Sequence, residues 1–301
     1  MRKHPVILGL GLLLLIGLFF LLLMALMGSL FGQRTLTWGE HVGVVTIEGV
    51  IRDSQEISRQ LNAFGKDGSI KAVVLRIDSP GGGVAPAQEI YDAVLAVKKK
   101  KKVVASMGSL AASGGYLIAC AADRVVANPG TVTGSISAIM HFANAEELLK
   151  KIGLKSSVVK SGRFKDIGTP TRPMTEDEKA LIQSLVDDTY DQFLEAVSKG
   201  RRIPKEDLRR IADGRVFTGR QAQKLGLVDE LGDLNYTVRL AGTLSGIKGE
   251  PDVIYPVKKK STFWELILQQ AVISLVGEMK KGDARSEGLN FLYDQGSIGT
   301  P

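Results

Sequence analysis

The segment DSPGGG at residues 78–83 places three consecutive glycines where a hydrophobic run ends. Glycine lets the backbone approach a ligand closely and leaves N–H groups free to donate hydrogen bonds to an anion. That anion is either a phosphate or the oxyanion of a tetrahedral intermediate in acyl transfer. This segment lacks both the P-loop pattern and the dinucleotide-binding pattern, which hold phosphates. A purely structural turn is the third interpretation.

A second segment rich in glycine and serine runs from Gly108 to Tyr116 and contains Ser109 and Ser113. Small residues on both sides of Ser113 allow a sharp turn that presents its hydroxyl at the start of a helix, although the G-x-S-x-G pattern is missing. Ser113 is therefore the first candidate nucleophile and Ser109 the second. The alternative is that Ser113 serves as a helix N-cap, a common position for serine.

A nucleophilic serine requires a base, which is most often histidine. Of the three histidines only His141 lies deep in the sequence, and no aspartate stands near it in sequence to orient the ring. The segment from Val158 to Asp166 offers Lys165 instead, with Lys160 as a rival. Lysine is protonated at neutral pH unless burial favours the neutral amine. A base at Lys165 therefore predicts a buried amine, with Asp166 directed away from it.

The segments that carry these residues follow alternating strand and helix patterns. Apolar alternation and β-branched residues predict strands at 41–48, 70–77 and 103–106, and helical spacing predicts helices at 53–64 and 85–97. The order βαβαβ is typical of a parallel sheet covered by helices. The sequence therefore indicates an α/β fold.

The second half of the chain continues the pattern. Thr175 and Glu178 form a capping box that opens a helix to about Lys199, and the apolar stripe of this helix fits either a core or a partner subunit. Shorter elements are expected as a strand at 158–160, a helix at 219–225, a strand at 227–229 and an amphipathic stretch at 263–279.

Residues 6–27 contain no charged side chain, and a helix of that length spans about 33 Å, roughly one hydrocarbon core. Arg2 and Lys3 precede this run and only Arg34 follows closely, so the positive-inside rule places the N-terminus in the cytoplasm. A cleaved signal peptide is the competing interpretation, but its apolar core is shorter, about 7 to 15 residues. We expect an anchor with its cytoplasmic start at 1–32, a main domain at 33–240, an extension at 241–280 and a disordered tail at 281–301.

Composition excludes several classes of protein. The net charge of +7 is spread along the chain and aromatic residues make up only 6%, which disfavours a nucleic-acid-binding protein. Cys120 is the single cysteine, so the chain has neither an internal disulfide nor a metal site built from several cysteines. The lysine run at 98–102 fits the solvated end of a helix better than a lipid contact.

We call the three segments at 78–83, 108–116 and 158–166 the chemical segments, because they carry the candidate site residues. Taken together, they resemble the signal peptide peptidase A family, Ser/Lys membrane peptidases that share the fold of the Clp protease and crotonase. The resemblance covers residues 41–232. Its strongest stretches are RIDSPGGG at 76–83, SMGSLAASGGYLIACAADRVVANPGTVTG at 106–134, KSGRFKDIG at 160–168 and ADGRVFTGRQAQKLGLVDELG at 212–232.

The resemblance implies a Clp-like βαβ superhelix preceded by a transmembrane helix. It implies that Ser113 is the acylating nucleophile, that Lys165 is the general base and that Ser135 orients the lysine amine. The implied oxyanion hole consists of N–H groups from Gly81 or Gly82 and from Gly114.

The same resemblance implies hydrolysis of hydrophobic peptides, such as signal-peptide remnants, without a metal or cofactor. The implied enzyme is a ring-like homo-oligomer that contacts membrane lipid through Val6 to Met27 and holds its catalytic domain outside the cytoplasm. Two other functions stay open: a crotonase-type acyl-CoA enzyme and a catalytically idle membrane scaffold.

Overall fold

The computed structural model describes residues 5–30, 39–256 and 290–292 of the chain. The chain divides into two units, Met1–Gly39 and Glu40–Pro301. The amphipathic stretch expected at 263–279 and most of the predicted tail lie outside the described residues. Each unit is described by itself.

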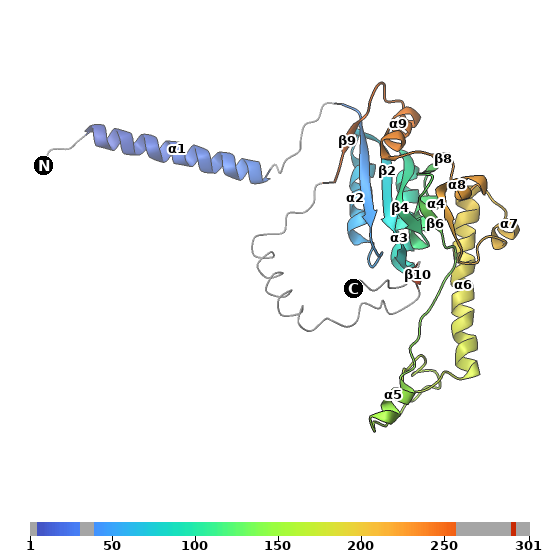
Figure 1. Cartoon of the computed structure of the whole chain (residues 1–301). Coiled ribbons are helices and arrows are strands. Elements are labelled where there is room, and N and C mark those ends of the chain that lie inside the picture. The colour runs from blue at the N-terminus through green and yellow to red at the C-terminus, as the bar shows by residue number, and fades with distance from the viewer. Residues whose placement is uncertain (1–4, 31–38, 257–289, 293–301) are drawn as a thin grey trace, which may run out of the picture. The chain divides into compact units, whose positions relative to one another are not determined.

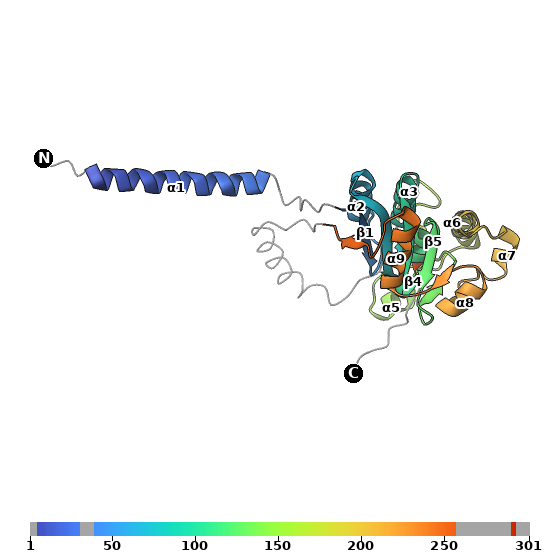
Figure 2. The same cartoon turned by 90° about the horizontal axis from the view of Figure 1, so that it is seen from above.

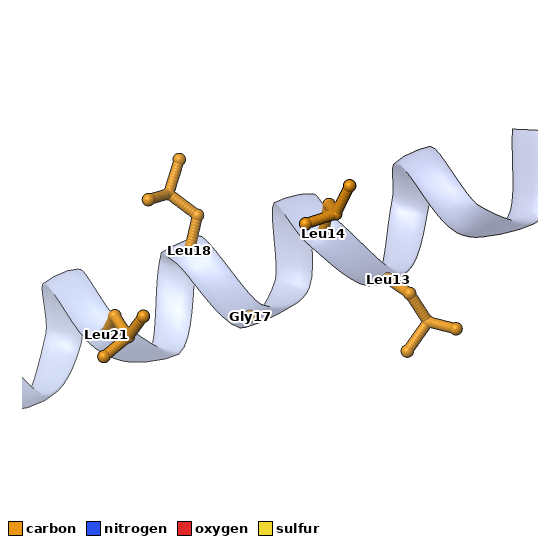
Figure 3. Close-up of a pocket in the computed structure, with 5 residues that line it drawn as sticks. All are labelled: Leu13, Leu14, Gly17, Leu18 and Leu21. Carbon is orange, nitrogen blue, oxygen red and sulfur yellow. The ribbon is translucent and has the colours of Figure 1, made fainter.

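The first unit holds α1 (Pro5–Leu30), which has no acidic residue in its first turn and no basic residue in its last. Its side chains are described for Gly9 and residues 11–24, and all of these are exposed. Figure 3 shows a shallow hollow at Gly17 whose other lining residues are Leu13, Leu14, Leu18 and Leu21. Counted over the described residues alone, no helix is long and apolar enough to cross a membrane.

The second unit is built on a mixed sheet. Its strands are β1 (His41–Glu48), β2 (Ile70–Ser79), β4 (Lys102–Ala112), β5 (Arg124–Ala127), β6 (Val132–Gly134), β7 (Val216–Thr218), β8 (Glu230–Leu231) and β9 (Asp252–Ile254). The order is β7-β6-β4-β2-β1-β9, and β5 pairs with both β4 and β8. Neighbouring strands are parallel except β6 and β7. The predicted α/β class and βαβαβ order are confirmed.

Helices cover both faces of this sheet (Figures 1 and 2). One face packs against α2 (Gln55–Lys66), α3 (Val84–Lys98), α4 (Gly114–Cys120) and the second half of α6 (Glu176–Arg201), and the other against α9 (Leu234–Ser245). The shorter helices are α5 (Glu146–Lys151), α7 (Lys205–Arg209) and α8 (Gly219–Lys224). Strand alternation explains the two cores, because Val42 and Val44 face α9 whereas Val45 and Ile47 face the larger cluster.

Three predicted strands differ from the structure. Strand β4 extends to Ala112, beyond the predicted end at residue 106, because small residues that resemble a loop still pair with β2 and β6. The strand predicted at 227–229 lies instead at Glu230–Leu231. The strand predicted at 158–160 is absent from the described chain, where Val159 is 99% exposed and no neighbouring strand is available to pair with.

Residues 139–188, which we call the arm, leave the body of the second unit. Figure 1 shows α5 and the start of α6 projecting beyond the sheet. The apolar stripe of α6 is divided accordingly: Phe193 and Val197 are buried, whereas Leu181 and Leu185 are exposed. Within the described part of the chain, the first half of α6 therefore has no core to pack against.

Candidate active site

Ser113 stands at the junction between β4 and α4 in a conformation that few non-glycine residues adopt. Its φ is 55° and its ψ is −120°, and only 1% of its surface is exposed. Although Ser113 occupies the N-cap position, its side chain makes no capping hydrogen bond. A left-handed backbone of this kind costs about 1–3 kcal/mol and is typically kept at functional sites. The geometry therefore favours the nucleophile interpretation over the capping one.

The glycine-rich segment lies against the start of α4. It forms the short strand β3 (Gly81–Gly83), and a Cβ added to Gly115 would lie 3.1 Å from the carbonyl oxygen of Ser79. A Cβ on Gly82 would lie 2.1 Å from the carbonyl oxygen of Ile51, so only glycine fits there. The fold thus brings the first two chemical segments together, as the sequence predicts.

The N–H groups of β3 are not equally free. Gly81 donates to Ser79 Oγ at 3.1 Å and Gly83 donates to the Ile51 carbonyl at 2.8 Å. Since successive residues of a strand direct their N–H groups to opposite edges, the N–H of Gly82 faces away from Ile51. Gly82 is therefore the member of this segment best placed to donate to a bound group.

Gly114 supplies a second donor. As the first residue of α4 it has no carbonyl one turn earlier in the helix to accept from its N–H. Ser79, which the sequence did not indicate as a site residue, holds the backbone of the glycine segment in place. Its hydroxyl donates to the Gly49 carbonyl at 2.6 Å and accepts from the Gly81 N–H. A serine directly before Pro-Gly-Gly-Gly was the available signal for this role.

A short C-terminal strand pairs with the same edge. Residues 290–292 form β10 (Asn290–Leu292), antiparallel to β3, with Phe291 opposite Gly82. The sequence predicts disorder at these residues, and the strand shows that this prediction is wrong for 290–292. An extended segment can thus add to β3 as a further strand, which is how many peptide-binding sites hold their ligands.

Ser135 lies beside Ser113. Strands β4 and β6 pair Ala112 with Gly134, and the Ser113 N–H donates to the Gly134 carbonyl at 2.9 Å. Ser135 also has a positive φ of 52° and is buried. The structure therefore brings together the backbones of two of the three residues of the predicted Ser/Lys site.

Lys165 is not among them. It lies on the arm, in the turn between α5 and α6, and its side chain is exposed. Among the described residues no hydrogen bond joins the side chains of Ser113 and Lys165. The burial that the sequence analysis expected for this amine is absent from the single chain.

Helix geometry explains the separation. Gly200, near the end of α6, lies against the last residue of α4, because an added Cβ would be 2.2 Å from the Cys120 carbonyl. From Gly200 back to Glu178 the helix rises about 33 Å, whereas α4 rises only about 9 Å from Cys120 to Gly114. The first turn of α6 therefore lies at least roughly 20 Å from Ser113.

The other candidate groups are poorly suited to catalysis. Lys160 forms an ion pair with Asp166 and donates to the Arg163 carbonyl at 2.8 Å, so its amine is already engaged within the arm. His141 is exposed on the arm and Ser109 is exposed within β4. Burial raises the pKa of the Cys120 thiol to about 12, so a thiolate nucleophile is excluded. No group of three metal-ligating side chains occurs among the described residues.

The first turn of α6 should respond to acid. Hydrogen bonds from Arg172 lower the pKa of Glu178 from its ordinary 4.5 to about 2. The ionised carboxylate therefore stabilises the folded arm above pH 4.5, and this stabilisation is lost as the pH falls toward 2. We expect hydrogen exchange of the α6 N-terminal turns, corrected for intrinsic rates, to lose protection over this range before β2 does. Equal loss in both elements, or unchanged behaviour in Glu178→Gln, would contradict the assignment.

The sequence is similar to those of known peptidases. Residues 96–248 match the model of peptidase family S49. The chain is 45% identical over 183 residues to a proposed protease of Synechocystis sp., covering 61% of this chain and 65% of that protein. It is 35% identical over 202 residues to a proposed signal peptide peptidase of Enterococcus faecium, covering 62% and 59% of the two chains.

Among solved structures, the chain is similar to a point mutant of ClpP1 from Listeria monocytogenes. The sequence identity is 17% and the TM-score 0.44, with 65% of this chain and 94% of that chain covered. The aligned region spans less than two thirds of either relative described above.

Proposed function

Because the chain belongs to peptidase family S49, we propose that it is a serine peptidase in which Ser113 is the nucleophile and Lys165 is the general base. The observation that carries this proposal is the strained backbone of Ser113 at the start of α4, beside the edge of β3. In other nucleophile elbows, a turn of this kind directs the serine hydroxyl at the acyl carbon of the bound substrate.

The oxyanion hole of this proposal consists of the N–H groups of Gly82 and Gly114. Gly81 is the weaker candidate because its N–H already donates to Ser79. Each such donor contributes about 3 to 4 kcal/mol to transition-state stabilisation in other proteases. The substrate is an extended peptide that adds to β3, in the position that β10 takes in the structure.

The general base is supplied by assembly. Lys165 is exposed on an arm whose first helical turn lies at least roughly 20 Å from Ser113, which supports a second copy of the chain as the source of the lysine at each serine. The arm is suited to such contact, because it exposes a set of large apolar side chains: Ile139, Phe142, Leu148, Ile152, Leu154, Val158, Val159, Leu181 and Leu185. We therefore propose a closed homo-oligomer in which the arm of one copy completes the site of another.

Catalysis then follows the usual acyl-transfer sequence. Ser113 Oγ attacks the peptide carbonyl while the neutral Lys165 amine accepts the hydroxyl proton, and Ser135 holds that amine in place. The lysine ammonium returns the proton to the leaving amine as the peptide bond breaks. Water then attacks the acyl-enzyme with the same base, releasing the acid product and regenerating the serine.

The proposed location is a membrane. Residues 6–27 carry no charge, and the described side chains of α1 are exposed and apolar on all sides, which suits lipid rather than water. Arg2 and Lys3 support a topology with the N-terminus in the cytoplasm and the peptidase domain outside it. Hydrophobic peptides at the bilayer, including signal-peptide remnants, are the proposed substrates.

A fluorophosphonate probe, which phosphonylates reactive serines with loss of fluoride, tests this proposal. We expect labelling of the full-length protein that disappears in Ser113→Ala, together with hydrolysis of an apolar fluorogenic peptide. Absence of both between about pH 7 and 9 would support a scaffold instead. Hydrolysis of an acyl-CoA thioester, without peptide cleavage, would support the crotonase alternative.

A further inference from the structure

A chain of ion pairs ties the turn that carries Lys165 to the start of α6. The Arg172 guanidinium donates to Asp166 through Nε at 3.2 Å and to Glu178 through two nitrogens at 2.8 and 2.6 Å. Asp166 also pairs with Lys160. Arg172 is therefore the bridge between the residue that follows Lys165 in the sequence and the first turn of α6.

The α6 end of this bridge is firmly held. Glu178 is only 2% exposed and accepts from the Thr175 N–H at 2.8 Å, while Thr175 Oγ1 accepts from the Glu178 N–H at 3.3 Å. This capping box leaves one face of the Glu178 carboxylate to Arg172, a two-nitrogen contact that an arginine can make and a lysine cannot. The guanidinium thus has a fixed position on the helix.

The other end of the bridge pairs with the carboxylate of Asp166, the neighbour of Lys165 in the sequence and therefore the acidic group most able to pair with the Lys165 amine. Asp166 directs its oxygens to Arg172 and Lys160, and the Lys165 N–H donates to the Gly162 carbonyl at 3.2 Å. The turn is thereby closed with the Asp166 carboxylate already satisfied. An unpaired Asp166 would instead stabilise the ammonium form of its neighbour.

We propose that Arg172 is a positioning residue that fixes the Lys165 turn on the first turn of α6 and keeps Asp166 from pairing with the Lys165 amine. This inference rests on the proposed function, in which Lys165 is the base. Activity would then require more than the fold and a Ser/Lys pair. It would also require an arginine, 7 residues after the lysine, whose side chain joins two acidic side chains.

The charged groups around the turn set the expected pH dependence. They come from the turn itself, from the segment after it and from α6: Lys160, Arg163, Asp166, Arg172, Asp177 and Glu178. Removing the Arg172 charge deprives Asp166 of one of its two cations. The freed carboxylate then favours the protonated amine, so the pH at which activity rises should move upward.

The test uses full-length protein in detergent and an apolar fluorogenic peptide, with kcat and KM measured from about pH 6 to 10. Arg172→Gln is expected to lower kcat about 10- to 100-fold and to change KM less than about twofold, because misplacing a catalytic group impairs chemistry more than binding. The rising limb of its pH–activity profile, which we call the activity limb, should move to higher pH by about half a unit or more. Its oligomeric state should be unchanged.

Lys179→Gln is the matched control. Lys179 lies in the first turns of α6 and forms an exposed ion pair with Glu176 at 2.8 Å, so the variant removes the same charge without touching the bridge. We expect its kcat and pH profile to match the wild type. Adding Asp166→Asn to Arg172→Gln should return the activity limb toward its wild-type pH, which a merely structural role of Arg172 would not do.

Each result decides between the proposals. A wild-type kcat and pH profile in Arg172→Gln, with Lys165→Ala inactive, would overturn the role of Arg172 and leave the peptidase assignment intact. An active Lys165→Ala would overturn Lys165 as the base. If Arg172→Gln does not assemble, Arg172→Lys replaces it: reduced kcat supports the bridge, and wild-type activity contradicts it.

Discussion

Ser113→Ala is expected to lower kcat at least about 10⁴-fold, the scale seen when other serine peptidases lose their nucleophile. The physical reason is that no other described hydroxyl combines the strained turn, the burial and the neighbouring Gly82 and Gly114 donors. The measurement is steady-state hydrolysis of an apolar fluorogenic peptide by the assembled protein, with active-site titration to count functional serines.

The same position offers a stability control. Glycine adopts a φ of 55° without the steric cost that alanine and serine bear. Ser113→Gly should therefore be inactive yet more stable than Ser113→Ala by about 1 kcal/mol, read from chemical denaturation of both variants. Retained peptidase activity in either variant would remove Ser113 from the mechanism, and equal stability would remove the argument from backbone strain.

Lys165→Ala is expected to lower kcat about 10²- to 10⁴-fold, the usual contribution of a general base. Lys165→Arg should be equally impaired although it keeps the charge and the reach, because a guanidinium does not deprotonate in proteins. Lys160→Ala should leave appreciable activity, because Asp166 keeps its contact with Arg172 and the turn stays tied to α6. Wild-type activity should rise on the alkaline side, and a flat profile between about pH 6 and 9 would contradict a lysine base.

Mixing two inactive variants tests where Lys165 comes from. If the arm of one copy completes the site of another, co-assembled Ser113→Ala and Lys165→Ala chains should regain about one quarter of wild-type activity, the fraction of sites at which two intact partners meet. A site built within one chain would regain none. Separately assembled variants, mixed without subunit exchange, are the control.

The sequence predicted the central elements well because their signals are local. Strand β1 begins and ends as expected, and α3 differs by one residue at each end, since alternation and helical spacing are read directly from neighbouring residues. The roles of Ser113 and the glycine segment are predicted from local signals of the same kind. Small residues beside a serine indicate a turn whatever the rest of the chain does.

What could not be predicted depends on residues distant in the sequence or in other copies. The exposure of Lys165 follows from the length of α6, whose first half leaves the core. The choice of Gly82 over Gly81 follows from the Ser79 hydroxyl and the Ile51 carbonyl, which a linear pattern does not place. Val158 and Val159 predict a strand, but a strand forms only where another strand is available to pair with it.

The distance between Ser113 Oγ and the nearest Lys165 Nζ in an experimental structure of the assembled protein tests the central claim most directly. The account predicts a separation of about 2.6 to 3.2 Å, with Ser113 and Lys165 contributed by different copies and the amine shielded from solvent. A Lys165 amine that remains in solvent, out of hydrogen-bonding reach of every Ser113 in the assembly, would contradict it.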